Sequence, residues 1–134
     1  MAATEKTNAE IVKELYEAFN RGDLETCVAG FADDITWTEP AGSPLASGTY
    51  SGTDDVVENV FAPLDEQFEE FEVVVDRVID GGDTIVMEGK HRTMPVDGDS
   101  FEVPCVHIMD MKGGKVTEFT SYEDTALTQQ LMDE

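Results

Sequence analysis

Apolar residues recur at helical spacing in the first half of the chain. Thr7-Asn8-Ala9-Glu10 has the pattern of a capping box, and the apolar stripe after it consists of Ile11, Val12, Leu15 and Phe19. Gly22 is expected to end this helix, and Asp23 can cap a short second helix. Thr53-Asp54-Asp55 is expected to open a third helix, which Pro63 would close.

Elsewhere the apolar and polar residues alternate with the period of two that indicates β-strands. Strands are predicted over Ile35 to Glu39, Phe71 to Ile79, Thr84 to Met94, Ser100 to Met111 and Lys115 to Asp124. Pro40 to Gly52 is rich in Gly, Ser and Pro and predicts a loop, and Thr125 to Met132 predicts a last helical turn. Helices on one face of a curled antiparallel sheet make an α+β architecture, with a cleft where a small ligand can bind.

Composition narrows the class of protein. The 134 residues are expected to form a single domain over 1–134. There are 30 acidic residues against 8 basic ones, and the net charge of −22 disfavours nucleic acid and anionic membrane surfaces as partners. The acids are scattered through the whole chain, as in proteins adapted to high salt, where repulsion is screened. A halophilic source is therefore expected, and the charge says little about the substrate.

The two cysteines, Cys27 and Cys105, lie far apart in the sequence. No signal-peptide pattern and no apolar run long enough to span a bilayer is present, so we expect a cytoplasmic protein with two reduced thiols. The sequence contains no CxxC, HExxH or Cys/His cluster. We therefore expect no metal site and no cofactor.

Three segments together resemble a known family. "YEAFNRGDLE" (Tyr16 to Glu25), "FADDITWTEP" (Phe31 to Pro40) and "GKVTEFTSYED" (Gly114 to Asp124) are similar, in order and spacing, to the SnoaL-like, ketosteroid-isomerase-like branch of the nuclear-transport-factor-two superfamily. The resemblance implies a cystatin-like cone, in which a curved antiparallel sheet wraps around three N-terminal helices and encloses a pocket. It also implies a homodimer formed through the outer face of the sheet. This superfamily includes isomerases, polyketide cyclases, dehydratases and plain binding domains, so fold alone does not give function.

Glu39 is the first candidate for chemistry. It precedes Pro40, which favours extended backbone, and it shares a strand face with Trp37 and Ile35. If that face lines the interior, desolvation raises the pKa of the carboxyl toward the value that a general base or acid needs. The resemblance places Glu39 where ketosteroid isomerases have their base. The alternative is a solvated glutamate at a strand end.

The same resemblance indicates that the two oxyanion-binding groups of a steroid isomerase are missing from this sequence. Alignment on Asn20, Gly22 and Asp23 puts Leu15 where that family has its oxyanion tyrosine, with Tyr16 one residue away. Alignment on Pro104 puts Val106 where it has a protonated aspartate. One such donor is worth about 3 kcal/mol to the transition state, so we do not expect a steroid isomerase.

Two histidines are further candidates. Gly89-Lys90-His91 resembles the Gly-x-His of SnoaL-like polyketide cyclases, whose histidine lies at the active site, and Gly89 is expected to leave room for a ligand. The alternative is an inert histidine at the pocket rim. For His107, a two-residue turn at Gly113-Gly114 would place it on the outer sheet face, and Val106 and Ile108 would then share the inner face with Phe119 and Ser121. A one-residue bulge would reverse this and turn His107 into the pocket.

Two functions remain open at this point. The first is a cofactor-free acid/base enzyme, of cyclase, isomerase or dehydratase type, that acts on a small hydrophobic carbonyl compound through Glu39 and His91, with His107 as a second-rank site. The second is a non-catalytic domain for ligand binding or dimerisation. The residues expected to contact a ligand are Tyr16, Phe19, Trp37, Phe61, Met87, Val106, Phe119 and Ser121.

Overall fold

The protein is described by a computed structural model, which covers residues 6–43 and 47–133. The helices are α1 (Asn8–Asn20), α2 (Leu24–Ala29), α3 (Thr53–Val56), the π-helical turn η1 (Val57–Phe61), α4 (Ala62–Gln67) and α5 (Thr125–Asp133). The strands are β1 (Phe31–Glu39), β2 (Gly48–Ser51), β3 (Phe68–Asp80), β4 (Thr84–Pro95), β5 (Phe101–Lys112) and β6 (Lys115–Glu123).

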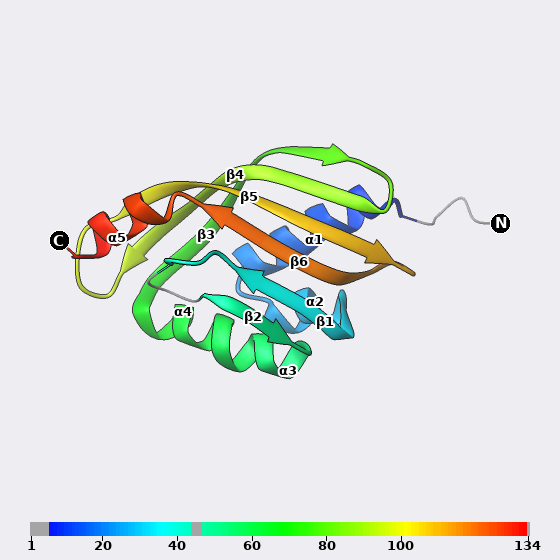
Figure 1. Ribbon diagram of the computed structural model, residues 1–134, viewed down its shortest axis with the longest axis horizontal. Helices are drawn as coiled ribbons and strands as arrows, with labels where there is room; N and C mark the ends of the chain where they lie inside the picture. The colour runs from blue at the N-terminus through cyan, green and yellow to red at the C-terminus, as the bar shows by residue number, and fades with distance from the viewer. Residues whose placement is uncertain (1–5, 44–46, 134) are drawn as a thin grey trace.

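The six strands form one curved sheet in the order β2-β1-β6-β5-β4-β3. All neighbours are antiparallel except β1 and β6, which run parallel and bring Trp37 opposite Phe119. Figure 1 shows the long strands curving over α1, with α3 and α4 beside β2. The predicted α+β fold, with a curved sheet and N-terminal helices, is confirmed. Across the described ranges, every helix is too short or too polar to cross a bilayer.

The predicted start of α1 is confirmed in detail. Thr7 Oγ1 accepts a hydrogen bond from Glu10 N, and Glu10 Oε1 accepts one from Thr7 N, each at 3.1 Å. This reciprocal pair satisfies two of the free N–H groups at the helix start. The predicted cap of α2 is also present, because Asp23 Oδ1 accepts from Thr26 N at 3.2 Å. These caps fix where α1 begins and so which of its side chains face the sheet.

Several element boundaries differ from the sequence prediction, and two of the differences change which elements are present. Pro63 does not close the third helix; the helical segment continues through α4 to Gln67, with Pro63 in the first turn of α4. Pro63 lies inside a continuous helical segment and closely follows the π-helical turn η1, a local departure from the regular hydrogen-bond ladder of the kind found where a helix accommodates a proline. The expected loop over Pro40 to Gly52 contains the short strand β2, which pairs with the end of β1. The Gly and Ser content of this segment predicted a loop, but pairing with β1 makes part of it an edge strand, because strand formation depends more on context than on intrinsic propensity.

The register of β5 and β6 corrects the placement of His107. A bulge lies between Asp110 and Met111, so that Met109 pairs with Phe119 and His107 pairs with Ser121. Thr117 Oγ1 donates to Asp110 O at 3.2 Å across this irregularity. Because one inserted residue exchanges the two faces of a strand, the prediction of an outward His107 is wrong.

Gly89 has a structural role that differs from the expected one. A Cβ at this position would overlap the carbonyl oxygen of Val74 on β3 and would lie 2.9 Å from Met87 Sδ. The glycine therefore permits the close approach of β3, next to the bulge between Val75 and Arg77. The expectation that Gly89 leaves room for a ligand is wrong.

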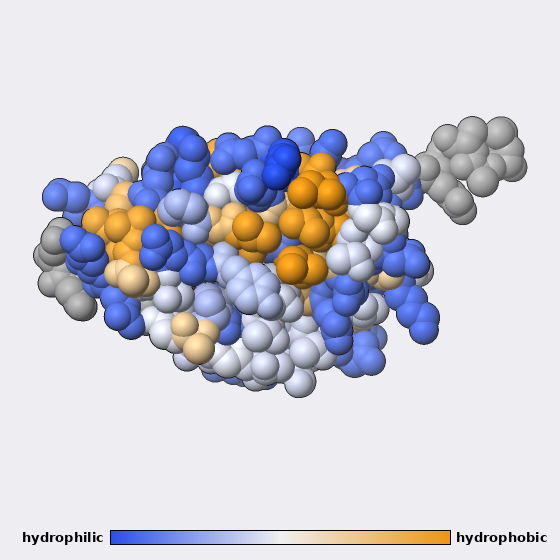
Figure 2. Space-filling view, turned by 45° about the horizontal axis from the view of Figure 1, so that its top comes forward, coloured by the Kyte–Doolittle hydropathy of each residue, from blue (hydrophilic) through white to orange (hydrophobic). Residues whose placement is uncertain are grey.

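The molecular surface is dominated by polar residues. Figure 2 shows one face on which hydrophobic residues gather in two patches, with hydrophilic residues between them and residues of intermediate hydropathy below. Among the described residues, Glu39 and Glu123 are the acids that line the interior cavity, and neither belongs to the hydrophobic core cluster. The origin of the net charge of −22 in adaptation to high salt stays a prediction.

Candidate functional site

The helices and the inner face of the sheet enclose a cavity of about 80 Å³. Nine of the predicted residues line it: Tyr16, Phe19, Trp37, Glu39, Phe61, His91, His107, Phe119 and Ser121. An engineered cavity of about 150 Å³ accommodates benzene, so this smaller space suits a ligand more compact than benzene. Most of the lining is apolar, which makes any polar group in the wall costly unless it has a partner.

Two of the residues predicted to contact a ligand, Met87 and Val106, do not line this cavity. Met87 has an inward side chain with no exposed surface, but it belongs to the core and not to the cavity lining. Val106 pairs with Tyr122 on the outer face of the sheet. The reason is the same bulge that turned His107 inward, since neighbouring residues of a strand point to opposite faces.

Glu39 lies in the cavity wall at the end of β1, on the same face as Trp37. Trp37 Nε1 donates a hydrogen bond to Glu39 Oε2 at 2.6 Å. Burial raises the pKa of Glu39 to about 7, the Trp37 bond opposes this rise, and the Glu123 carboxylate adds to it. A carboxyl with a pKa near neutrality can accept and return a proton at physiological pH.

The indole that holds Glu39 is itself held by aromatic contacts. The rings of Trp37 and Phe119 are stacked with centroids 3.6 Å apart, and Phe61 meets the indole edge-on at 5.5 Å. The parallel pairing of β1 and β6 produces this stack, because it places Trp37 directly opposite Phe119. The position of the Glu39 carboxyl is thus fixed by packing on two other elements.

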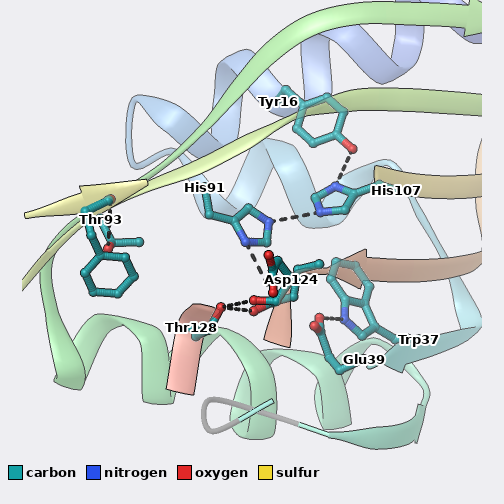
Figure 3. Close-up of polar contacts among 10 residues, drawn as sticks. Tyr16, Trp37, Glu39, His91, Thr93, His107, Asp124 and Thr128 are labelled. Carbon is teal, nitrogen blue, oxygen red and sulfur yellow. Dashed lines mark hydrogen bonds and ion pairs between the residues drawn. The ribbon is translucent and has the colours of Figure 1, made fainter. Parts of the chain in front are cut away.

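A chain of polar contacts crosses the interior beside this wall (Figure 3). Tyr16 Oη, from α1, lies 2.7 Å from His107 Nδ1, and His107 Nε2 lies 3.1 Å from His91 Nε2. Burial lowers the pKa of His91 to about 4, and burial together with His91 lowers the pKa of His107. Both imidazoles are therefore neutral at pH 7, and each ring has one N–H donor and one acceptor nitrogen.

This series of polar contacts ends at Glu123, a residue that the sequence analysis missed. Glu123 Oε1 lies 3.7 Å from His91 Nδ1, and Glu123 Oε2 accepts from Thr128 Oγ1 at 2.7 Å. Only 3% of the Glu123 side chain is exposed, and burial raises its pKa. The alternation of β6 could have found this residue, because Glu123 follows Phe119 and Ser121 on the inner face.

Ser121 is the cavity residue with an unsatisfied group. Its side chain is 1% exposed, and its Oγ has no hydrogen-bond partner among the described residues. A buried hydroxyl without a partner costs about 1–3 kcal/mol. Since Ser121 lines the cavity, the polar atom of a ligand or a bound water would find a ready partner there.

Both cysteines are buried, free thiols, as expected for reduced residues. Burial is the main cause that raises the pKa of Cys27 and of Cys105 to about 12. Cys105 lies near the two histidines: His91, Cys105 and His107 each offer a ligand atom, and the three atoms lie within 4.8 Å of one another. The described residues thus bring together a set of nitrogen and sulfur donors that a borderline metal ion prefers.

Comparison with known proteins identifies relatives of this chain. The family model of the SnoaL-like domain matches residues 12–119. An NTF2-like protein from Burkholderia thailandensis is 34% identical, with a TM-score of 0.88, and the match covers 96% of this chain and 98% of that one. An NTF2-like protein of unknown function from Burkholderia pseudomallei is 32% identical over 97% of this chain and 100% of that one, also with a TM-score of 0.88.

A third similar structure is TerC co-crystallised with polyporic acid. It is 25% identical, has a TM-score of 0.85, and the match covers 95% of this chain and 98% of that one. No curated protein matches the sequence.

Proposed function

Because the chain belongs to the SnoaL-like family, we propose that it is an acid/base enzyme acting on a small hydrophobic carbonyl compound. The observation that carries this proposal is Glu39, a carboxyl in the wall of an apolar cavity with its pKa raised to about 7. Perturbed pKa values cluster at functional sites, where desolvation and specific neighbours shift them. Cyclase, isomerase and dehydratase reactions all need such a group.

In this proposal Glu39 removes a proton from the carbon next to the carbonyl and returns it later. The proton transfer itself requires no cofactor. The neutral chain of Tyr16, His107 and His91 polarises or orients the carbonyl oxygen, because a neutral hydrogen-bond donor in an apolar cavity stabilises developing negative charge strongly. The similar structure TerC, which was co-crystallised with polyporic acid, supports the proposal that this chain binds a small organic molecule.

The experiment is deuterium exchange at the α-carbon of a panel of small ketones, followed by NMR for the parent and for Glu39→Gln. Loss of a positioned general base lowers rates by roughly 100- to 10,000-fold. Glu118→Gln is the matched control, since Glu118 is an exposed glutamate on β6. The parent rate should rise with pH and level off above about 7, as Glu39 loses its proton. Equal rates for the parent and Glu39→Gln would overturn the proposal.

The alternative function is a small-molecule-binding domain that does no chemistry. It is compatible with the largely apolar cavity lining and with the unsatisfied Ser121 hydroxyl, which would pair with a ligand in a binding protein just as in an enzyme. Native mass spectrometry of the purified protein distinguishes the two. A retained small molecule that binds the parent and Glu39→Gln equally, without exchange by either protein, supports the binding domain.

We also propose a homodimer through the outer face of the sheet. Val106 and Ile108 are only partly buried there and Tyr122 is 56% exposed, so apolar area remains to be covered. Native mass spectrometry or light scattering should give the mass of two chains, and Ile108→Lys should give one. A parent that is monomeric at working concentrations contradicts this proposal.

A further inference from the structure

We propose that His91, Cys105 and His107 form a binding site for a divalent metal ion such as Zn²⁺, with a fourth coordination position open to the cavity. This assignment goes beyond the proton transfer proposed above and does not depend on it. It also departs from the sequence-based expectation of no metal. The argument rests on the placement of the donor atoms, on the partners of the two imidazoles, on charge and on the unsatisfied hydroxyl of Ser121.

The strand register explains why three donors meet. In the pairing of β4 with β5, Met87 lies opposite His107, Gly89 opposite Cys105 and His91 opposite Val103. Cys105 therefore lies midway along the strands between the two histidines, on the same inner face. The imidazoles lean toward each other, and their Nε2 atoms come within 3.1 Å. Two nitrogens bound to one tetrahedral Zn²⁺ at about 2.0–2.1 Å are separated by a similar distance.

The outer nitrogen of each ring faces an oxygen that could accept its N–H when the other nitrogen binds a metal ion. His107 Nδ1 lies 2.7 Å from Tyr16 Oη (Figure 3), and His91 Nδ1 faces Glu123 Oε1 at 3.7 Å, which is longer than a hydrogen bond. A histidine ligand usually donates its second N–H to an oxygen of this kind, which fixes the tautomer and makes the other nitrogen a better ligand. With both rings protonated at Nδ1, both Nε2 lone pairs are free for an ion.

Charge and coordination number also fit. A divalent ion with one thiolate and two neutral imidazoles carries a charge of +1, and a Glu123 carboxylate would neutralise it. Three protein ligands leave one position of a tetrahedral ion for water or substrate oxygen. The unsatisfied Ser121 Oγ belongs to the cavity wall directly opposite His107 in the sheet, where it can bond to that water or oxygen.

The ion would hold a carbonyl oxygen in the cavity that Glu39 also lines and would polarise it as a Lewis acid. Metal binding requires that Cys105 lose its proton to solvent, so one proton is released for each ion bound. If the acid/base function is absent, the ion can still bind, and if no ion binds, Glu39 can still transfer a proton. The two proposals therefore fail separately.

The test is a titration of the full chain with CoCl₂ after chelator treatment under reducing conditions. Cobalt bound by a thiolate gives a sulfur-to-cobalt charge-transfer band, and four-coordinate cobalt gives intense visible bands. We expect both to saturate at one ion per chain, to be displaced by ZnCl₂, and to accompany release of one proton. Cobalt held by surface carboxylates gives neither spectrum, so the acidic surface does not confuse the result.

The variants make the test specific. Cys105→Ser should abolish the charge-transfer band, whereas Cys27→Ser, which removes the other buried thiol, should leave it unchanged. Circular dichroism and melting curves of each metal-free variant show that it is folded. A folded parent that develops no charge-transfer band, or a band that survives Cys105→Ser, overturns the proposal. In that case histidine ¹⁵N shifts should show an N–H···N bond between the two Nε2 atoms, with or without added Zn²⁺.

Discussion

The two polar parts of the cavity wall respond to the same environment in opposite directions. Burial raises the pKa of Glu39 on β1 to about 7 and lowers the pKa of His91 on β4 to about 4. In both cases desolvation disfavours the charged form. The two groups differ in where the shifted pKa lies relative to pH 7: Glu39 titrates near neutrality, whereas His91 stays uncharged throughout the physiological range.

This contrast assigns different chemistry to the two parts of the wall. Glu39 can change its protonation state at pH 7 and so can transfer a proton. The histidines cannot gain a proton there, which suits them to hydrogen bonding or to metal ligation. In water the assignment would be reversed: an imidazole has the pKa closer to 7 and would be the better group for proton transfer, whereas a carboxyl would stay ionised. The cavity, more than residue type, therefore sets the roles.

The largest effect on stability is expected for Glu39→Gln at high pH. The pKa of Glu39 is raised in the folded state, so between about pH 4.5 and 7 the folded protein holds a proton that the unfolded chain has lost. The free energy of unfolding then falls as pH rises through this window, by up to about 3 kcal/mol. Glu39→Gln avoids this loss and keeps an acceptor for Trp37.

Urea unfolding at several pH values checks this prediction. The stability of Glu39→Gln relative to the parent should increase by about 3 kcal/mol from pH 4.5 to pH 8. Glu118→Gln, a substitution at an exposed glutamate, serves as the control for the loss of one carboxyl. A constant difference across this range would mean that Glu39 has an ordinary pKa in the folded protein.

The opposite pH dependence is expected for His91. Its pKa is lowered in the folded state, so below about pH 6.5 the unfolded chain binds a proton that the folded protein does not. Its contribution to stability is present above this pH and is lost as pH falls, by about 2 kcal/mol at pH 5. In chelator-treated protein, His91→Gln should therefore lose less stability than the parent between pH 8 and pH 5. Parallel curves for the two proteins would contradict the contrast between the two parts of the wall.

A smaller effect is expected for Tyr16→Phe. This change removes the hydroxyl that pairs with His107 Nδ1 and leaves a buried ring nitrogen without a partner, at a cost of about 1–3 kcal/mol. Tyr50→Phe is the control, because the Tyr50 hydroxyl bonds to Ser47 O in an exposed position. Tyr16→Phe should lower the urea midpoint of unfolding more than Tyr50→Phe does. Equal midpoints would show that the contact between Tyr16 and His107 adds nothing to stability.

Local pattern was sufficient for much of the fold. The capping box at Thr7 and the cap at Asp23 were predicted from adjacent residues, since both depend on contacts within one helical turn. The shared face of Trp37 and Glu39 followed from the period of two. Strand β2 was missed because its four residues have loop composition, and only pairing with β1 makes them a strand.

The candidate site was predicted in part. His91 was placed inward correctly from the apolar face of its strand, whereas His107 was placed outward because the turn sequence contains no sign of the bulge near Thr117. Glu123 was overlooked, since its importance depends on a contact with His91 at 3.7 Å that no spacing in the sequence indicates.

The sequence by itself determined the family, the helix starts and the strand faces of Glu39 and His91, because capping and periodicity operate over a few residues. Only the tertiary structure decided the side on which His107 lies, the pKa of Glu39 and the meeting of His91, Cys105 and His107. Those features depend on register across the sheet and on exclusion of water, and both arise from residues far apart in the chain.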